Sequence, residues 1–214
     1  FRARAGSAVR EPSNRPVQRI SWGEAQSFCK WLQERFAATI PRGYRVGLPS
    51  EVEWEKAARG GTDTPIKGQE VVVSIGDGLP MAPRMQLEPN PLPTRDVPWA
   101  TSSSTNKVSA SHCNSALTGI QNTSALGCFS TGASPYGCHD MLGNVDEWTR
   151  SLYTEYPYVA NDGREDETSR ASRVTRGGGY DQGDYALSCT MRHSYLPNLM
   201  YSRLGFRVVV YRVS

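Results

Sequence analysis

The sequence has no long hydrophobic run and little excess charge of either sign. No stretch reaches the roughly 18 apolar residues of a membrane-spanning helix, and the first residues hold no apolar signal-peptide core, although a signal already removed would leave no trace. The 24 Lys and Arg nearly balance the 21 Asp and Glu, for a net charge of +3 with no basic stripe. We therefore expect neither a membrane span nor a nucleic-acid partner.

Cysteine is also scarce. Five cysteines are too few for a disulfide scaffold, and none falls in a Cys-x-x-Cys motif. Cys113 and Cys128 flank a loop rich in Ser, Thr and Asn, so a disulfide between them is one interpretation and two free thiols are the other. A zinc site is a weaker interpretation, because the spacing of its ligands would be irregular: His112, Cys113, Cys128, Cys138 and His139. The cellular compartment stays open.

The chain is long enough to bury a substantial core. Its 214 residues, with 38% hydrophobic content, fit one large domain or two small ones. Residues 1–15 are rich in Arg, Ala, Ser and Pro and show no periodicity, which predicts an N-terminal tail or entering segment. We expect residues 16–214 to form a single domain.

Two capping boxes predict two helices in the first third of the chain. Ser21 is followed three residues later by Glu24, and the apolar residues after them recur at the spacing of one helical face. Ser50 and Glu53 repeat the motif. The second helix should run to Ala58 and end at the Gly-Gly pair shortly after it.

Little other regular structure is predicted before the last fifth of the chain. Residues 17–20 look like a short strand. Residues 62–136 are loaded with Gly, Pro, Ser, Thr and Asn, and only residues 71–74 suggest a strand there. A free loop of that length is uncommon in a compact domain, so side chains, a metal or a disulfide must pin it. The candidate anchors are Trp99, Leu126 and Phe129.

The last fifth of the chain holds two predicted strands with an irregular segment between them. Residues 173–176 form the first strand, and residues 205–211 form the second, with Phe206, Val208 and Val210 on one face. The segment between them mixes Tyr and Leu with Asp, Ser and His and has no helical period. Apolar side chains exposed there would form a binding surface, as Tyr does in antibody loops. The alternative is that the core beneath is plugged by Leu187, Tyr195 and Leu196.

A second motif that could carry function spans residues 137–148. The carboxylates of Asp140 and Glu147 bracket two turns that glycine permits, so both carboxylates and the carbonyls between them could converge on a hard cation such as calcium. On the residues alone, the favoured interpretation is that these side chains face water. The adjacent Cys138 and His139 are not evidence of a catalytic trio with Asp140, because neighbours in sequence point apart.

Four sequence blocks follow one another across about residues 16–210. They are Ile20-Ser21-Trp22 with Ala25, Cys29 and Trp31; Arg45 to Pro49 with Glu53-Trp54-Glu55 and Ala57 to Gly61; Asp140 to Trp148; and Arg176-Gly177-Gly178 with Leu204 to Arg207. Together these blocks resemble the formylglycine-generating enzyme (sulfatase-modifying factor) family. The resemblance implies an α+β fold of the C-type lectin-like kind that this family has, with two helices, short strands and much irregular structure.

The resemblance also carries expectations about metals. It implies a structural calcium ion bound by Asp140, the carbonyls of Gly143 and Val145, and Glu147. The family's oxidase chemistry uses a copper-binding pair of cysteine thiolates shortly after the Gly-Gly-x-Tyr turn, and copper(I) has no substitute for thiolate there. The matching positions in this chain contain no cysteine, and Cys189 alone does not make the pair. We therefore expect no copper.

The variable proteins of diversity-generating retroelements resemble the chain in the same blocks and vary in this C-terminal segment. That group uses a C-type lectin-like fold to present diversified residues that bind ligands. We therefore predict a non-catalytic protein whose ligand is a protein or another macromolecule. The alternatives are a formylglycine-generating or related metal-dependent oxidoreductase, a degenerate paralogue of one, and a purely structural domain. The residues expected to bind ligand are Asp181, Asp184, Tyr185, His193, Ser194, Tyr195, Leu196, Leu199, Tyr201, Ser202 and Arg203.

Overall fold

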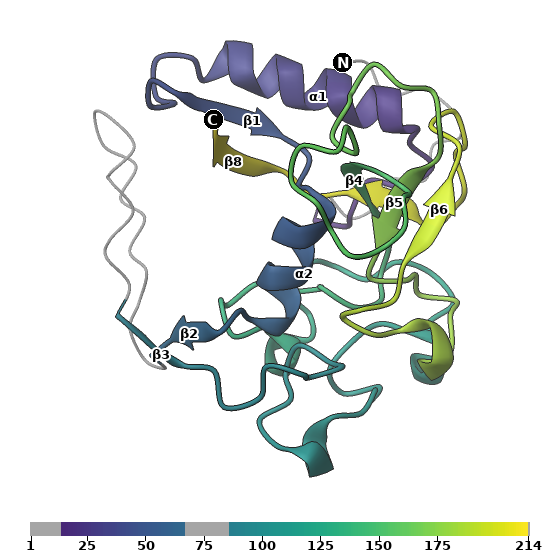
Figure 1. Cartoon of the computed structure of the whole chain (residues 1–214). Coiled ribbons are helices and arrows are strands. Elements are labelled where there is room, and N and C mark those ends of the chain that lie inside the picture. Colours follow the sequence, from purple (N-terminus) through teal and green to yellow (C-terminus); the bar gives the residue numbers. More distant parts are fainter. Residues whose placement is uncertain (1–13, 67–85, 214) are drawn as a thin grey trace.

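The structure is a computed structural model that describes residues 14–66 and 86–213. It combines two α-helices with short strands and long irregular segments (Figure 1). Most of the tail expected at residues 1–15, and the strand expected at residues 71–74, lie outside the described residues. Among the described residues, no helix has the length and apolar character that crossing a bilayer requires.

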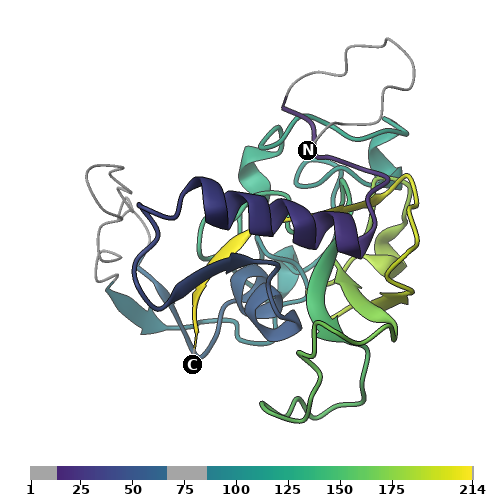
Figure 2. The ribbon, with the colours of Figure 1, turned by 90° about the horizontal axis from the view of Figure 1, so that it is seen from above.

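Helix α1, Trp22–Arg35, begins where its capping box predicts. The Ser21 hydroxyl accepts a hydrogen bond from the Glu24 N–H (3.3 Å), and the Glu24 carboxylate accepts one from the Ser21 N–H (2.9 Å). The helix lies along strand β1, Tyr44–Gly47 (Figures 1 and 2). Its inner face is buried through Trp22, Ala25 and Cys29.

The prediction of a strand at residues 17–20 is wrong. These residues form no strand, although the chain runs directly into α1 after them. Arg19 has a φ of +57°, which lies outside the extended region that a strand needs. The short apolar pattern therefore reports burial of Ile20 rather than pairing with another strand.

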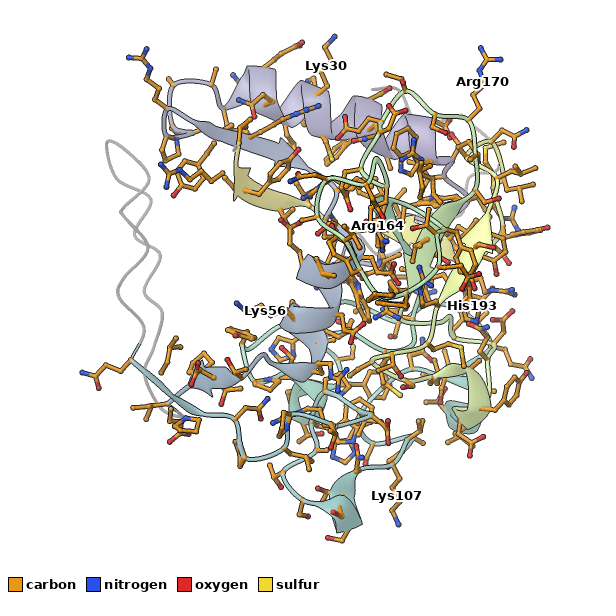
Figure 3. The ribbon with its side chains drawn as sticks, in the orientation of Figure 1. Lys30, Lys56, Lys107, Arg164, Arg170 and His193 are labelled. Carbon is orange, nitrogen blue, oxygen red and sulfur yellow. The ribbon has the colours of Figure 1, made fainter. Side chains whose placement is uncertain are left out.

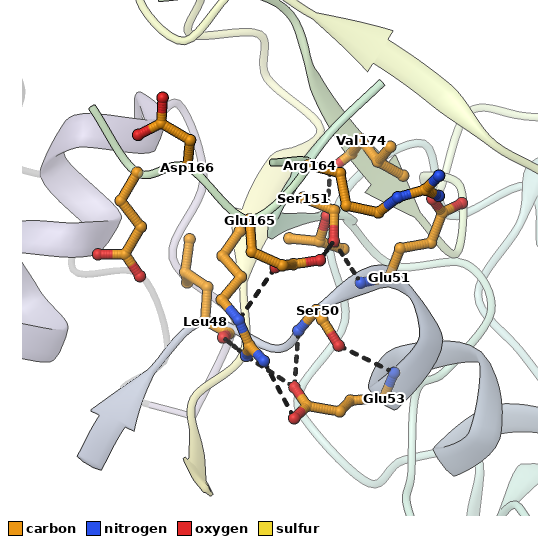
Figure 4. Close-up of polar contacts among 12 residues, drawn as sticks. Leu48, Ser50, Glu51, Glu53, Ser151, Arg164, Glu165, Asp166 and Val174 are labelled. Atoms are coloured by element: carbon orange, nitrogen blue, oxygen red, sulfur yellow. Dashed lines mark hydrogen bonds and ion pairs between the residues drawn. The ribbon is translucent and has the colours of Figure 1, made fainter. Parts of the chain in front are cut away.

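Helix α2, Glu51–Arg59, confirms the second capping box. The Ser50 N–H donates to Oε2 of Glu53 (2.7 Å), and the Ser50 hydroxyl accepts from the Glu53 N–H (3.2 Å; Figure 4). The helix ends at Gly60, which has a φ of +83°. A Cβ at this position would lie 2.7 Å from Cγ2 of Thr64, so glycine is required by both conformation and space.

The central sheet has four strands in the order β6-β5-β4-β7. Strand β4, Asp146–Leu152, pairs antiparallel with β5, Arg173–Arg176, and β5 pairs antiparallel with β6, His193–Tyr195. Strand β7, Leu204–Phe206, pairs in parallel with β4. Strand β5 confirms the sequence prediction for residues 173–176, whereas β6 lies in the segment that was expected to be irregular.

The strand expected over residues 205–211 is two strands. Strand β7 ends at Phe206, and β8, Val209–Arg212, pairs antiparallel with β1 in a separate ribbon. The chain changes sheets between them, so the predicted alternation of faces fails: Phe206 is half-buried and Val210 is 49% exposed. The break between β7 and β8 is set by their pairing with distant strands, which hydrophobic periodicity does not indicate.

Two clusters of buried side chains form the core. One cluster lies between α1 and the central sheet and includes Trp22, Ala25, Cys29, Leu48, Trp148 and Leu204. The other lies around α2 and the long loop region, and includes Trp54, Ala58, Val97, Met141, Leu142 and Cys189. A two-stranded ribbon, β2 (Asp63–Pro65) with β3 (Leu87–Pro89), follows α2.

The α2 end of the molecule is tied to β4 and to the loop after it. The Glu51 N–H donates to the Ser151 hydroxyl (2.9 Å), which donates in turn to Oε1 of Glu165 (2.6 Å; Figure 4). The Arg150 guanidinium bonds both oxygens of Glu53, at 2.7 and 3.1 Å. Polar contacts therefore fix the helix N-terminus against the sheet.

The long segment between β3 and β4 is pinned mainly by polar groups. Arg95 is 5% exposed and donates to the carbonyls of Leu92 (3.1 Å) and Ala100 (2.9 Å) and to Oδ1 of Asn90 (2.7 Å). The only helical turns between β3 and β4 are three 3-10 segments: Ser103–Thr105, Ala116–Thr118 and Ser130–Gly132. Of the expected anchors, Trp99 packs against the second core cluster and stacks on His112, with ring centroids 5.1 Å apart. Phe129 is half-buried, whereas Leu126 is 55% exposed and is not an anchor in the core.

Candidate binding face

Residues 181–203 connect β5 to β7, and the strands at both ends of this segment are buried. Arg176, at the end of β5, is fully buried and donates through Nη2 to Glu55 (2.6 Å) and to the carbonyl of Cys189 (2.8 Å). Leu204, at the start of β7, is also fully buried. The frame that carries the segment is therefore rigid at its two ends.

Arg192 ties the middle of the segment to α2. Its Nη2 lies 2.8 Å from Oε2 of Glu51, a carboxylate with no exposed surface, and 3.0 Å from the carbonyl of Thr154. The rings of Tyr153 and Tyr156 both contact the guanidinium, with centroids 4.6 and 4.5 Å from its carbon. Burial alone lowers the pKa of Arg192, but its bond to Glu51 raises that pKa above the ordinary value. Arg192 is therefore a structural cation.

None of the predicted ligand-binding residues is fully buried. Tyr185 is 80% exposed and Leu196 is 51% exposed, while His193 lies at the edge of the molecule on β6 (Figure 3). The exposed members are Asp181, Asp184, Tyr185, Ser194, Leu196 and Tyr201, and the half-buried members are His193, Tyr195, Leu199, Ser202 and Arg203. Together these residues are called the display face below.

Two residues of the display face also contribute to the core. Tyr195 and Leu199 pack against the cluster beneath α1, and the Tyr195 ring lies edge-on to Trp148 with centroids 6.2 Å apart. Leu187 is buried, as the core-plugging interpretation expects, whereas Leu196 is not. The segment therefore combines inward side chains that hold it in place with outward side chains that remain accessible.

Asp146 is the charged centre beneath the display face. It is fully buried, its Oδ1 lies 3.2 Å from Nδ1 of His193, and its Oδ2 accepts a bond from Nε of Arg203 (3.1 Å). The Gly178 N–H donates to Oδ1 (3.2 Å). Burial alone lowers the pKa of Arg203, but the Tyr195 hydroxyl and the charge of Asp146 outweigh it, so that pKa lies above the ordinary value.

Several residues of this region were missed by the sequence prediction. Asp146 lies within the Asp140 to Trp148 block, but nothing in its spacing indicates that it faces His193. Met200 is 45% exposed within the segment itself. Tyr153 and Tyr156 are 46% and 48% exposed and come from the connection between β4 and β5. Strand pairing brings them to the segment, and that pairing has no local sequence signal.

The carboxylates of Asp140, before β4, and of Glu147, within β4, lie in separate hydrogen-bond networks. Oδ2 of Asp140 accepts a bond from the Gly127 N–H (2.8 Å). Oε2 of Glu147 accepts a bond from Nε1 of Trp54 (2.7 Å), and the Arg207 guanidinium binds both Glu147 oxygens. Glu147 is therefore already neutralised by an internal cation.

This arrangement sets a condition on calcium binding. A calcium ion held by Asp140, Gly143, Val145 and Glu147 would share the Glu147 carboxylate with a guanidinium of like charge. The residue types suit calcium, since they supply carboxylate and carbonyl oxygen, but the fit is incomplete while Arg207 stays in place. Calcium at these four positions stays a prediction.

The cysteines are free thiols in the structure, so the disulfide between Cys113 and Cys128 is not formed. Burial raises the pKa of Cys113 to about 11 and that of Cys189 to about 12, so both thiols are neutral near pH 7. Within residues 14–66 and 86–213, no three His, Cys, Asp or Glu side chains come together as metal ligands. The zinc interpretation therefore finds no support in that part of the chain.

The sulfatase-modifying factor enzyme 1-like domain matches residues 2–212. The chain belongs to this family. Among family members, the formylglycine-generating enzyme of Mus musculus is 28% identical over 205 residues, which cover 94% of this chain and 45% of the mouse protein. The inactive C-alpha-formylglycine-generating enzyme 2 of Mus musculus is 30% identical over 207 residues, covering 94% and 51%. The chain thus spans about half the length of these relatives.

The fold of the chain is also similar to that of a solved structure. Treponema denticola variable protein 1 matches with a TM-score of 0.63 and 20% identity, covering 97% of this chain and 76% of that one. At this level of identity the match shows the fold alone. The C-type lectin-like fold of the formylglycine-generating enzyme type, predicted from the sequence blocks, is therefore confirmed, with its two helices, short strands and irregular connections.

Proposed function

We propose that this sulfatase-modifying factor family member is a non-catalytic binding protein whose display face takes a protein or another macromolecule as ligand. The observation that carries the proposal is the exposure of that face on a buried frame. None of its residues is fully buried, whereas Arg176 and Leu204 on either side of it are. Accessible side chains on rigid strands are the arrangement that a binding protein needs.

The chemistry of the face suits a macromolecular ligand. Tyr185, Leu196 and Tyr201 are exposed by 80%, 51% and 47%, and Met200 beside them is 45% exposed. Aromatic side chains supply large contact area at low entropic cost and are common energetic anchors of protein interfaces. Polar residues such as Asp181 lie among them, so the face can form an apolar centre with a polar rim.

Two features support a non-catalytic role. Residues 181–187, which correspond to the copper-binding positions of the enzymes, contain no cysteine, and Leu187 is buried in the segment. One of the most similar curated relatives is described as inactive, and the structurally similar Treponema protein is described as a variable protein. Both descriptions are of those proteins. They are consistent with a member of this fold that binds without catalysing a reaction.

A selection experiment tests this proposal. A library randomised at Tyr185, Leu196 and Tyr201 should yield binders to purified protein targets, and the selected variants should keep the melting temperature of the parent. A matched library at Leu117 and Ile120, which are 54% and 46% exposed on the long loop, should yield fewer binders of lower affinity. Equal yields from the two libraries would count against a specialised face.

We propose further that the display face is diversified, as in the retroelement variable proteins that the sequence blocks resemble, and the genomic neighbourhood tests this part independently. We expect a near-copy of the codons for residues 180–203, differing only at adenines, close to a reverse-transcriptase gene. If no such copy exists, the diversification part of the proposal fails, while the binding role is still tested by the selection.

A further inference from the structure

A cavity of about 680 Å³ lies between α1, the segment that leads into it, and the chain between β7 and β8. No residue of the display face lines it. Its size falls within the range of small-molecule sites, roughly 300–1,000 Å³. The cavity is therefore a second candidate site, separate from the proposed macromolecular one.

Most of the cavity wall is apolar. Phe28 from α1 and Phe206 from β7 meet there edge to face, with ring centroids 5.5 Å apart. Aliphatic side chains complete this wall: Val17, Ile20, Leu126 and Val208. A flat aromatic or branched aliphatic body fits such a surface, because aromatic walls favour stacked and edge-on contacts.

Arg207 gives the cavity a polar end. Its Nε and Nη2 bind Glu147, and Nη2 also donates to the carbonyls of His139 (3.3 Å) and Asp140 (3.2 Å). Nη1 has no hydrogen-bond partner among the described residues and is not one of their buried, unpartnered atoms. The guanidinium is thus held in one orientation while one of its nitrogens stays accessible.

Both carboxylates of the lining already accept hydrogen bonds from groups of this chain. Glu147 accepts bonds from Arg207 and Trp54, and Asp140 accepts one from the Gly127 N–H. The accessible nitrogen of Arg207 can therefore donate to a ligand group that accepts hydrogen bonds, and a bond from a guanidinium is strongest to a carboxylate.

We propose that this cavity binds a small molecule with an apolar, preferably aromatic, body and a carboxylate that Nη1 of Arg207 recognises. The Glu147 carboxylate positions Arg207 for this contact. The site acts independently of the display face, so the full chain can hold a small ligand and a macromolecule at once.

The probe for this proposal is 2-naphthoate, with the neutral 2-naphthamide as its matched control. Titration into the full chain, followed by calorimetry, should give a dissociation constant on the order of 0.1 mM for naphthoate. Binding of the amide should be about tenfold weaker, or by about 1.4 kcal/mol, because the amide lacks the charge that strengthens a hydrogen bond to a guanidinium. Equal affinities for the two probes, or no binding of either, would overturn the proposal.

Rim variants locate the site without touching the Arg207 ion pair. Leu126 is 55% exposed, so Leu126→Glu and Leu126→Lys should fold normally and shift naphthoate affinity about threefold or more, downward and upward respectively. Leu117→Glu, at an exposed residue outside the lining, should change nothing. Circular dichroism confirms folding of each variant. Unaltered affinity in both Leu126 variants would contradict the proposal, as would probe-induced NMR shifts at Tyr201 and Leu196 instead of Phe28 and Val208.

Discussion

Nδ1 of His193 lies 3.2 Å from Oδ1 of Asp146, so a residue of the display face reaches a fully buried carboxylate. Arg203, also on the display face, bonds the other oxygen of the same group. A buried charge needs partners, since leaving it unpaired is costly. The face is therefore free to change at its outer residues, and it is constrained at His193 and Arg203, which bond Asp146, as well as at Tyr195 and Leu199, which pack against the core.

The first prediction concerns this constraint. Arg203→Ala should lower the free energy of unfolding by about 1–3 kcal/mol, because Asp146 loses its charged hydrogen bond. Adding Asp146→Asn should recover part of the loss, which a double-mutant cycle by urea denaturation measures. Arg170→Ala, at an exposed arginine shown in Figure 3, is the control and should stay within about 0.5 kcal/mol. Additive effects of Arg203→Ala and Asp146→Asn would show that the two side chains are not coupled.

The second prediction separates the outer and inner residues of the segment. Tyr185→Ala and Leu196→Ala should each change stability by no more than about 0.5 kcal/mol, because both side chains are exposed. Tyr195→Ala should cost about 2–3 kcal/mol, less than a fully buried aromatic, because its half-buried ring packs on Trp148. Leu204→Ala provides the benchmark of a fully buried residue, at about 2–5 kcal/mol. If Leu196→Ala lowers the melting temperature as much as Leu204→Ala does, Leu196 is a core residue.

The third prediction concerns calcium. If Asp140, Gly143, Val145 and Glu147 bind it, EDTA should lower the melting temperature, because a ligand bound only to the folded state stabilises that state. Arg207→Gln, which frees the Glu147 carboxylate, should enlarge the shift on adding calcium. Glu147→Gln is the matched control and should abolish it. If EDTA leaves the melting temperature unchanged, in protein shown to contain no tightly held metal, the calcium site is not present.

The fourth prediction concerns enzymatic activity. Supplied with copper, oxygen and a cysteine-containing sulfatase peptide, the protein should form no formylglycine. The only cysteine of the C-terminal segment, Cys189, is fully buried, and burial raises the pKa of its thiol to about 12. Mass spectrometry of the peptide measures the product against a heat-killed sample. Turnover that disappears in Cys189→Ser would establish an enzyme in place of a binding protein.

The fifth prediction concerns pH. The ordinary pKa of a thiol here is 9.0, and burial raises it to about 11 for Cys29 and Cys113 and to about 12 for Cys189. Since the pKa is higher in the folded state, this stabilisation is complete below pH 9 and is lost as pH rises toward 11–12. Urea midpoints should therefore fall as pH rises from about 9 toward 11, the range between the ordinary and the raised pKa of Cys29 and Cys113.

Thiol labelling checks the same assignment. At pH 8 a thiol reagent should modify the exposed Cys128 quickly and Cys29, Cys113 and Cys189 only after denaturation. Cys128→Ser should remove the fast phase. Rapid labelling of Cys189 in native protein would contradict its burial.

Local signals explain what the sequence could predict. Both helices begin at their capping boxes, because Ser21 with Glu24 and Ser50 with Glu53 are bonded within three residues of each other. The strand at residues 173–176 likewise follows from a pattern that is continuous in the chain. These features need no knowledge of distant partners.

Distant partners explain what the sequence could not predict. Phe206 and Val210 fall in different ribbons because β7 pairs with β4 and β8 pairs with β1. Asp146 gains its role from His193, forty-seven positions away. The long loop is held by Arg95 bonded to main-chain carbonyls, a contact that leaves no periodicity in the sequence. Each of these features depends on a contact that the fold creates.

The parallel and antiparallel neighbours of β4 have one further consequence. Strands β5 and β7 flank this single strand, so both ends of the segment 181–203 are clamped to the same support. The entropic cost of lengthening a flexible connection between fixed ends grows slowly, by about 0.6 kcal/mol for each doubling. The scaffold should therefore accept grafted loops of quite different length near Asp184 and Tyr185, provided that Leu187 and Arg192 are retained.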